Sequence, residues 1–301
     1  MTRSVRLIVN PAAGGGRARH AAAAAAAALA GLGVRYQVTE SRSLPHAREL
    51  AAAAAAAGSV AAAVGGDGLA GALAGAVAAE GGVLGLIPAG RGNDLARVLG
   101  IPAAPQAAAA LVARGAPRTV DLISVSVPGQ PELLVAGSVY AGLPSVAGEI
   151  ANATRWLAGP AVYPVAALRA LAAWRPVTFG LDQPAAREFP GYAVVIANIA
   201  YFGAGMMVAP GAAMDDGALD LVSMRHGGRL AFLRVLLKIR DGSHLGLPRV
   251  GLDRVRTVTL TMDRALPVAA DGELLPGAGP LPAGTPLTVA ARPAALAVLA
   301  P

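Results

Sequence analysis

The sequence predicts an α/β fold in which an N-terminal parallel-sheet domain is followed by a C-terminal, mainly β domain of sandwich-like type. Three observations predict this organisation. Apolar strand-like runs alternate with alanine-rich helical runs over the first 125 residues, and glycine-rich turns follow three of the strand-like runs. After residue 121 the pattern changes to short strand-like runs separated by proline and glycine. We therefore expect a first domain over residues 1–122 and a second over residues 123–290.

The elements of the first domain alternate along the chain. Apolar and β-branched side chains cluster in four runs, where we expect strands: residues 6–10, 34–39, 60–64 and 83–87. Alanine, the best helix former, dominates the runs where we expect helices: residues 18–32, 46–57, 69–80, 93–99 and 104–113. Strands that alternate with helices form a parallel sheet covered on both faces. Ligands of such sheets bind at the carboxyl ends of the strands.

The second domain is expected to be built mainly from short strands, at residues 123–127, 133–140, 177–181, 192–199, 218–224, 255–262 and 286–290. Two helices are expected, at residues 162–174 and 228–240. The apolar side chains of the second helix cover a wide arc, with Arg234 and Lys238 on the remainder. This pattern fits a helix that faces a membrane, and it equally fits a helix packed on a sheet.

Composition excludes several classes of protein. Hydrophobic residues make up 55% of the 301 residues and charged residues 14%, which excludes a disordered or fibrous chain. The chain has no cysteine, which excludes disulfides, thiolate metal sites and a catalytic thiol. Glycine, serine or charged residues interrupt the alanine runs before they could span a bilayer. We expect a globular protein of the reducing cytoplasm.

The charge balance indicates an anionic partner. The 25 basic and 18 acidic side chains give a net charge of +7, and every cation except Lys238 is an arginine, whose planar fork suits phosphate oxygens. Nucleotide phosphates and an anionic membrane surface both fit. We expect no nucleic-acid partner, because the chain has no aromatic interleaving and no known nucleic-acid module.

Three glycine-rich segments follow expected strands and precede expected helices: residues 10–17 (NPAAGGGR), 65–68 (GGDG) and 88–94 (PAGRGND). Because parallel strands end at one edge of a sheet, the three segments should converge. Backbone N–H groups and helix N-termini there bind anions, and a neighbouring carboxylate completes a Mg-nucleotide site. The P-loop and dinucleotide fingerprints are absent. For GGDG alone, a tight turn that uses the conformational freedom of glycine remains an alternative.

The order and spacing of these three motifs resemble the diacylglycerol kinase catalytic-domain family, which includes bacterial lipid kinases and the sphingosine and ceramide kinases. The resemblance continues through residues 198–205 (NIAYFGAG), 209–220 (APGAAMDDGALD) and 271–273 (DGE), so it covers nearly the whole chain. It implies an α/β nucleotide-binding domain and a β-sandwich-like domain, with ATP and Mg²⁺ in the cleft between them. It also implies that residues 291–301 return to the first domain.

The resemblance implies a set of nucleotide-binding residues: Asn10, Pro11, Ala12, Ala13, Gly14, Arg17, Ser41, Gly65, Gly66, Gly68, Gly90, Asn93 and Asp94. Two members have plain alternatives. Ser41 also fits an ordinary loop or cap serine, and Arg17 also fits a surface arginine that only solubilises the protein.

The resemblance also implies catalytic and metal-binding residues. Glu273, in the motif that begins at Asp271, matches the family's proton acceptor, which takes the proton of a lipid hydroxyl, while Asp67 acts through Mg²⁺. Without the upstream motifs, residues 271–273 would be read as a turn. Asp216, with the carbonyls of Ala213 and Ala218, matches a structural second-metal site, and a simple turn is again the alternative.

The loop after GGDG departs from the family pattern. Leu69, Gly71 and Ala72 replace three polar residues, and Arg91 replaces a usual threonine. The expected function is that of a cytoplasmic, peripherally membrane-associated lipid kinase that converts diacylglycerol to phosphatidic acid with Mg-ATP. Two alternatives stay open: a nucleotide-binding regulatory member without turnover, for which the departures argue, and a soluble NAD-kinase-like enzyme. A homodimer is also left open.

Overall fold

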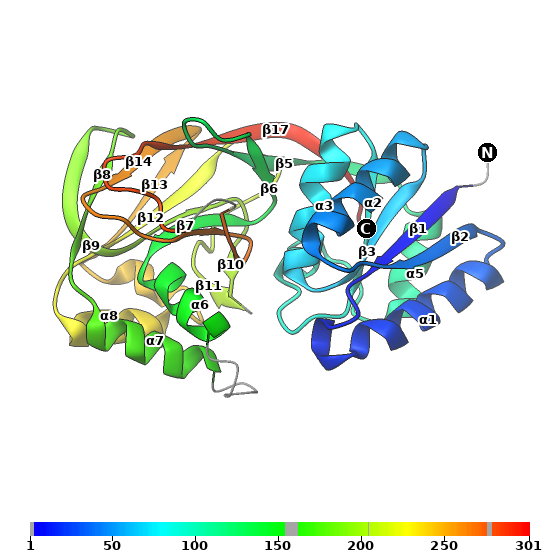
Figure 1. The fold of residues 1–301 in the computed structure, drawn as a ribbon, viewed down its shortest axis with the longest axis horizontal. Coiled ribbons are helices and arrows are strands. Elements are labelled where there is room, and N and C mark those ends of the chain that lie inside the picture. The colour runs from blue at the N-terminus through cyan, green and yellow to red at the C-terminus, as the bar shows by residue number, and fades with distance from the viewer. Residues whose placement is uncertain (1–2, 154–161, 204, 276–278) are drawn as a thin grey trace.

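The computed structural model describes residues 3–153, 162–203, 205–275 and 279–301. Two lobes lie side by side, the first in blue and cyan and the second in green to orange, and β17 in red runs between them (Figure 1). The mixed α/β architecture, with a parallel N-terminal sheet and a β-rich C-terminal lobe, confirms the predicted fold class.

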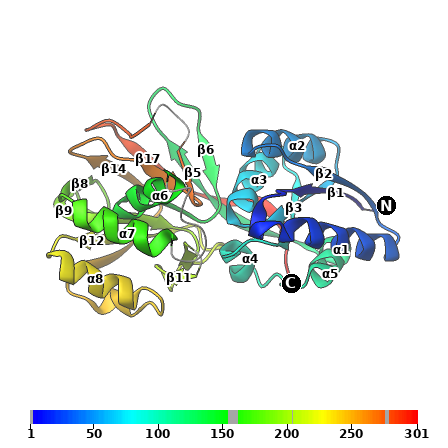
Figure 2. The ribbon, with the colours of Figure 1, turned by 60° about the horizontal axis from the view of Figure 1, so that its bottom comes forward.

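The first lobe contains a parallel sheet of four strands in the order β4-β3-β1-β2. The strands are β1 (Ser4–Val9), β2 (Arg35–Glu40), β3 (Val60–Gly65) and β4 (Val83–Pro88). The helices are α1 (Arg17–Gly31), α2 (Leu44–Ala56), α3 (Asp67–Ala79), α4 (Asp94–Val98) and α5 (Pro105–Arg114), with a short 3₁₀ turn η1 (Ala13–Gly15). Figure 2 shows α2 and α3 on one face of the sheet and α1 and α5 on the other.

Small side chains hold this lobe together. Every residue of β3, whose sequence is VAAAVG, is buried, as expected of a central parallel strand that is covered on both faces. Alanines of the covering helices, such as Ala25, Ala51 and Ala74, are also fully buried. The helices consequently lie close to the sheet, and the loops at the strand ends lie close to one another.

The second lobe is built largely from antiparallel strands. They are β5 (Pro117–Ser126), β6 (Leu133–Val135), β7 (Ser138–Gly142), β8 (Val177–Leu181), β9 (Arg187–Ala197), β12 (Leu219–Arg225), β13 (Val250–Val255), β14 (Thr257–Met262), β15 (Val268–Ala270), β16 (Glu273–Leu274) and β17 (Leu287–Leu299). A separate two-stranded ribbon is formed by β10 (Tyr201–Phe202) and β11 (Met206–Met207). The helices are α6 (Leu143–Ala153), α7 (Val162–Ala173) and α8 (Arg229–Lys238), with the 3₁₀ turn η2 (Ser243–Gly246).

Two predicted strands of this lobe were wrong in detail, and one helix was missed. The single strand expected at residues 133–140 is divided into β6 and β7, because the backbone between them turns to bind a carboxylate described below. The strand expected at residues 255–262 is the last residue of β13 and the whole of β14. Helix α6 was not predicted, because its sequence LPSVAGEIANA contains proline and glycine.

Strand β17 joins the two lobes. Its first part pairs with β14 and β5, and its last part pairs with β5 and, in parallel, with β4 of the first lobe. The predicted strand at 286–290 is therefore too short. The crossing point is fixed by Asp121, a buried residue whose carboxylate accepts hydrogen bonds from Ala294 N at 2.8 Å and Gly217 N at 2.7 Å. This continuous sheet fixes the edge of the first lobe against the second.

Over the described residues, the longest apolar helices fall short of what a membrane crossing requires.

Candidate active site

The three glycine-rich loops converge as predicted. They follow the adjacent strands β1, β3 and β4, and backbone hydrogen bonds join them at their start: Asn10 N to Val64 O at 3.1 Å and Ala89 N to Gly65 O at 2.7 Å. Asn10 Oδ1 also accepts a hydrogen bond from Ala12 N at 3.1 Å, which closes the turn through Pro11. The loops therefore form one continuous surface at the carboxyl edge of the sheet.

Two glycines explain why the loops can lie so close. Gly14 has a left-handed backbone with φ of 61°, and a Cβ on it would overlap the carbonyl oxygen of Ala89. A Cβ on Gly90 would overlap the Cα of Gly66. The first and third loops, and the second and third, thus contact each other through bare backbone.

The surface presents groups that bind anions. Helix α3 begins at Asp67, and its N-cap Gly66 provides no side-chain cap. The first N–H groups of a helix have no partner inside the helix, and they lie at the positive end of its dipole. An uncapped N-terminus beside glycine loops is a binding site for phosphate oxygens.

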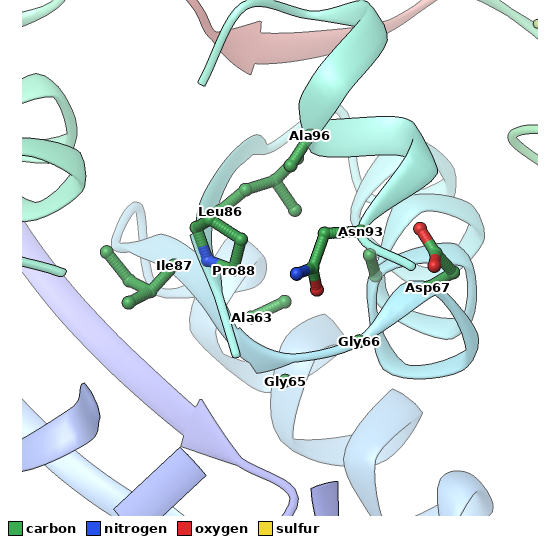
Figure 3. A pocket seen from close by; sticks show the side chains of 10 residues that line it. Ala63, Gly65, Gly66, Asp67, Leu86, Ile87, Pro88, Asn93 and Ala96 are labelled. Atoms are coloured by element: carbon green, nitrogen blue, oxygen red, sulfur yellow. The ribbon is translucent and has the colours of Figure 1, made fainter. Parts of the chain in front are cut away.

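Asn93 and Asp67 shape the space between the second and third loops. Asn93 has φ of 53°, and its side chain accepts from Gly90 N at 2.8 Å and donates to Gly90 O at 3.3 Å. Asp67 Oδ1 accepts from Leu95 N at 3.1 Å, so this carboxylate lies at the start of α4. A pocket lies between them, and Figure 3 shows Asn93 projecting between Pro88 and Gly66. Its lining is Ala63, Gly65, Gly66, Asp67, Ala70, Leu86, Ile87, Pro88, Asn93 and Ala96.

Two predicted side chains at the rim of this surface form hydrogen bonds with the protein itself. Arg17 donates to Gly14 O at 3.0 Å and to Gly90 O at 3.2 Å, so it bridges the first and third loops. The buried Ser41 hydroxyl donates to the carbonyl of Val9 at 3.1 Å, at the end of β1.

Asp94 connects the two lobes. Its carboxylate accepts from Gly205 N at 3.2 Å, across the boundary to the second lobe, and pairs with Arg97 at 3.3 Å. A direct contact of Asp94 with nucleotide would therefore compete with this link.

Asp271 is held firmly by the second lobe. It lies in the turn between β15 and β16 with φ of 48°, and its carboxylate accepts hydrogen bonds from the backbone N–H groups of Ala136 at 2.9 Å, Gly137 at 2.8 Å and Ser138 at 3.0 Å. This is the carboxylate that divides β6 from β7. Burial raises the pKa of Asp271 to about 6; the three N–H groups oppose the rise and the charge of Asp67 adds to it. Asp271 thus anchors the turn that carries Glu273.

Glu273 lies against the first turn of α3. A Cβ on Gly68 would be 3.1 Å from Glu273 Oε1, which places this carboxylate one residue along the helix from Asp67. Partial burial of the carboxyl raises the pKa of Glu273, and the cation of Arg48 on α2 lowers it. Arg48 was not predicted, because an arginine on an alanine-rich helix reads as a surface residue.

A second pocket lies on this side of α3. Apolar side chains dominate its lining, and Arg48, Asp271 and Glu273 supply the charges; the remaining members are Gly68, Gly71, Ala72, Leu133, Leu134, Val135, Ala270, Leu274 and Leu275. The first turn of α3 separates the two pockets, because residues 65–67 line the first and Gly68 lines the second. The predicted nucleotide and proton-acceptor residues thus meet at one helix N-terminus.

The departures after GGDG have structural partners in this chain. Leu69 is buried in the core beneath Gly65, where a Cβ on Gly65 would be 2.9 Å from Leu69 Cδ2. A Cβ on Gly71 would overlap Asp271 Oδ2 and would be 3.0 Å from Asp271 Cγ. Asp271 therefore occupies the space that a side chain at position 71 would need.

The predicted second metal site has partners of its own. Asp216 accepts a hydrogen bond from Ala218 N at 2.9 Å and forms an ion pair with Arg254. Burial, opposed by Arg254 and assisted by Asp216, raises the pKa of the neighbouring Asp220. Across the described ranges no three His, Asp or Glu side chains are grouped as metal ligands. Arg254 provides a positive charge beside Asp216, and the metal site with the carbonyls of Ala213 and Ala218 stays a prediction.

Comparison with known proteins gives consistent matches over both lobes. Residues 4–125 match the model of the diacylglycerol kinase catalytic domain, and residues 137–300 match the YegS C-terminal NAD kinase beta sandwich-like domain. A protein of Mycobacterium tuberculosis named diacylglycerol kinase is 35% identical over 301 residues, covering 99% of this chain and 95% of the relative. A probable YegS-like lipid kinase of Stenotrophomonas maltophilia is 30% identical over 195 residues, covering 63% and 62%.

The same fold is found among solved structures. That of a putative diacylglycerol kinase from Bacillus anthracis has a TM-score of 0.76 at 20% identity and covers 100% of this chain and 96% of that chain.

Proposed function

Because the chain belongs to the diacylglycerol kinase and YegS-like family of lipid kinases, we propose that it transfers the γ-phosphate of Mg-ATP to the free hydroxyl of diacylglycerol. The products are phosphatidic acid and ADP. The observation that carries the proposal is the position of the α3 N-terminus between a pocket beside three glycine loops and an apolar pocket that contains a carboxylate. Diacylglycerol is preferred to other lipids because the relative that covers nearly the whole chain is named for it.

The first lobe binds the nucleotide in this proposal. The uncapped N–H groups of α3 and the glycine loops receive phosphate oxygens, and the Arg17 guanidinium lies between two of the loops. Asp67 is a suitable ligand for Mg²⁺, a cation that proteins hold through one or two carboxylates together with substrate phosphates. When bound, Mg²⁺ neutralises the charge on the transferring phosphate.

The second pocket receives the lipid hydroxyl. Glu273 takes the hydroxyl proton as the oxygen forms its bond to the γ-phosphorus and the bond to the ADP oxygen breaks. Arg48 lowers the pKa of Glu273 and so partly opposes the rise caused by burial, which favours the ionised form that can accept the proton. Asp271 fixes the turn and thereby positions Glu273 beside the first turn of α3.

The regulatory alternative depended on the changed loop after GGDG. Leu69 packs in the core and Gly71 accommodates Asp271, so these two changes leave a closely packed site. The apolar lining of the second pocket favours a lipid acceptor over a soluble dinucleotide such as NAD.

A transfer assay tests the proposal. Purified protein is incubated with Mg²⁺ and ATP labelled in the γ-phosphate, and with diacylglycerol, a long-chain base, ceramide, a polyprenol or NAD. We expect label in phosphatidic acid. Label in another lipid alone would overturn the choice of diacylglycerol, and label in NAD alone, or in no product, would overturn the lipid-kinase proposal.

A further inference from the structure

Helix α8 has two apolar stripes on opposite faces. Phe232, Val235 and Ile239 are at most 5% exposed and pack in the core. Leu230, Leu233 and Leu237 have the same i, i+3, i+7 spacing and are 77%, 37% and 70% exposed. The two stripes are offset by two residues, about 200° around a helix. The buried stripe confirms that this helix packs on the core, and the exposed stripe leaves the membrane-facing interpretation as a prediction.

Helix α7, which is joined to α8 by a hydrogen bond, also exposes apolar side chains. Its Leu168 is 56% exposed, and Val165, one turn earlier, is also exposed. Arg229 at the start of α8 donates a hydrogen bond to Ala172 O near the end of α7 at 2.7 Å, and Figures 1 and 2 both show the two helices side by side. We call the exposed side chains of these two helices the α7–α8 surface.

The charged residues within α7 and α8 are all basic, while Asp241, just beyond the end of α8, places one carboxylate near Lys238. Arg234 and Lys238 lie on one side of the exposed leucine stripe, and Arg229 lies on the other, by the helical repeat. Arg169 adds a cation on α7, and the residues assigned to either helix include neither Asp nor Glu. Exposed leucines bordered by arginine and lysine are typical of helices that lie in the interface of an anionic membrane.

We propose that the α7–α8 surface docks the protein on an anionic lipid bilayer, with the exposed leucines among the acyl chains and the flanking cations among the head groups. A second copy of the chain is a poor occupant, because a symmetric dimer through this surface would bring like charges together. This docking proposal rests on the proposed function, because an enzyme whose lipid acceptor stays in the bilayer must work at the bilayer surface.

Sedimentation with vesicles tests the surface without any catalytic step. The full chain is mixed with phosphatidylcholine vesicles or with vesicles of phosphatidylcholine and phosphatidylglycerol, at low and high salt and without diacylglycerol or ATP. We expect preferential binding to the anionic vesicles that weakens with salt. Leu230→Ser/Leu237→Ser and Arg234→Glu/Lys238→Glu should each weaken this binding at least tenfold. Leu252→Ser, an exposed leucine of β13, and Arg35→Glu/Arg114→Glu, exposed arginines of the first lobe, are matched controls that should bind normally.

Each outcome decides between the proposals. Normal vesicle binding by both α8 variants, or absence of binding by the wild type, overturns the α7–α8 surface, and phosphorylation of diacylglycerol in detergent micelles would then still support the kinase. Vesicle binding that requires Leu230 and Leu237, without phosphorylation of any lipid, supports the surface and overturns the function. A wild-type dimer that the leucine variants convert to monomers, with vesicle binding unchanged, shows that a second copy occupies the surface.

Discussion

Substitution of Gly71 by alanine tests whether close packing of α3 positions the catalytic turn. The new Cβ would overlap Asp271 Oδ2 and lie 3.0 Å from its Cβ and Cγ. Asp271 cannot move away freely, because three backbone N–H groups hold its carboxylate. We therefore expect either α3 or the turn that carries Glu273 to shift.

The cost follows from two opposing effects. Overpacking in a closely packed region costs about 1–3 kcal/mol. Replacement of glycine by alanine inside a helix contributes about 1 kcal/mol in the stabilising direction. Gly148→Ala in α6 provides the matched control, because no atom lies within 4 Å of its added Cβ, so only the helix-propensity gain applies.

The two variants are compared by urea unfolding and by phosphate transfer to diacylglycerol. Gly71→Ala should be less stable than Gly148→Ala by about 1–3 kcal/mol, the overpacking cost alone. Its turnover should fall by roughly 10²-fold, the usual consequence of a 1 Å misplacement of a catalytic group. Equal stabilisation by both substitutions, with normal turnover in both variants, would refute the reasoning.

Three further predictions concern charge. Asp67→Asn should greatly weaken the Mg²⁺-dependent part of ATP binding measured by titration calorimetry, and unchanged binding would argue against Asp67 as a magnesium ligand. Arg48→Met should move the acid limb of the pH profile of kcat/KM to higher pH, because Arg48 lowers the pKa of Glu273; an unmoved limb would contradict its role. Folding raises the pKa of Asp271 to about 6, so ionisation of this carboxyl disfavours the folded state. The difference in free energy of unfolding between the wild type and Asp271→Asn should therefore change in favour of the variant as pH rises from about 4 to 6. A difference that stays constant with pH would show that the ionisation of Asp271 is not coupled to folding.

Local pattern was sufficient to predict the first lobe. Strands that alternate with helices form a parallel sheet, so the three glycine-rich segments had to end at one edge, and the structure joins them there. The helix expected at residues 69–80 is α3, which begins two residues earlier, at Asp67. The part of the site that depends on consecutive residues was therefore accessible from sequence.

Contacts between distant residues account for what was missed. Gly71 was interpreted as the loss of a polar group, and only its contact with Asp271, 200 positions later, shows the space that it provides. The strand expected at residues 286–290 continues as β17 into the first lobe, through a register shift between Arg292 and Leu296. The role of Arg48 depends on a turn that approaches α2 from the second lobe.

The most direct test of the central claim compares wild type with Glu273→Gln in transfer of labelled phosphate from ATP to diacylglycerol, with ATP binding measured in parallel. Glu188→Gln, at an exposed position of β9, is the control. We predict a loss of about 10²–10⁴-fold in transfer for Glu273→Gln, the usual range for a positioned general base, with ATP binding unchanged. Transfer at the wild-type rate by Glu273→Gln would contradict the account.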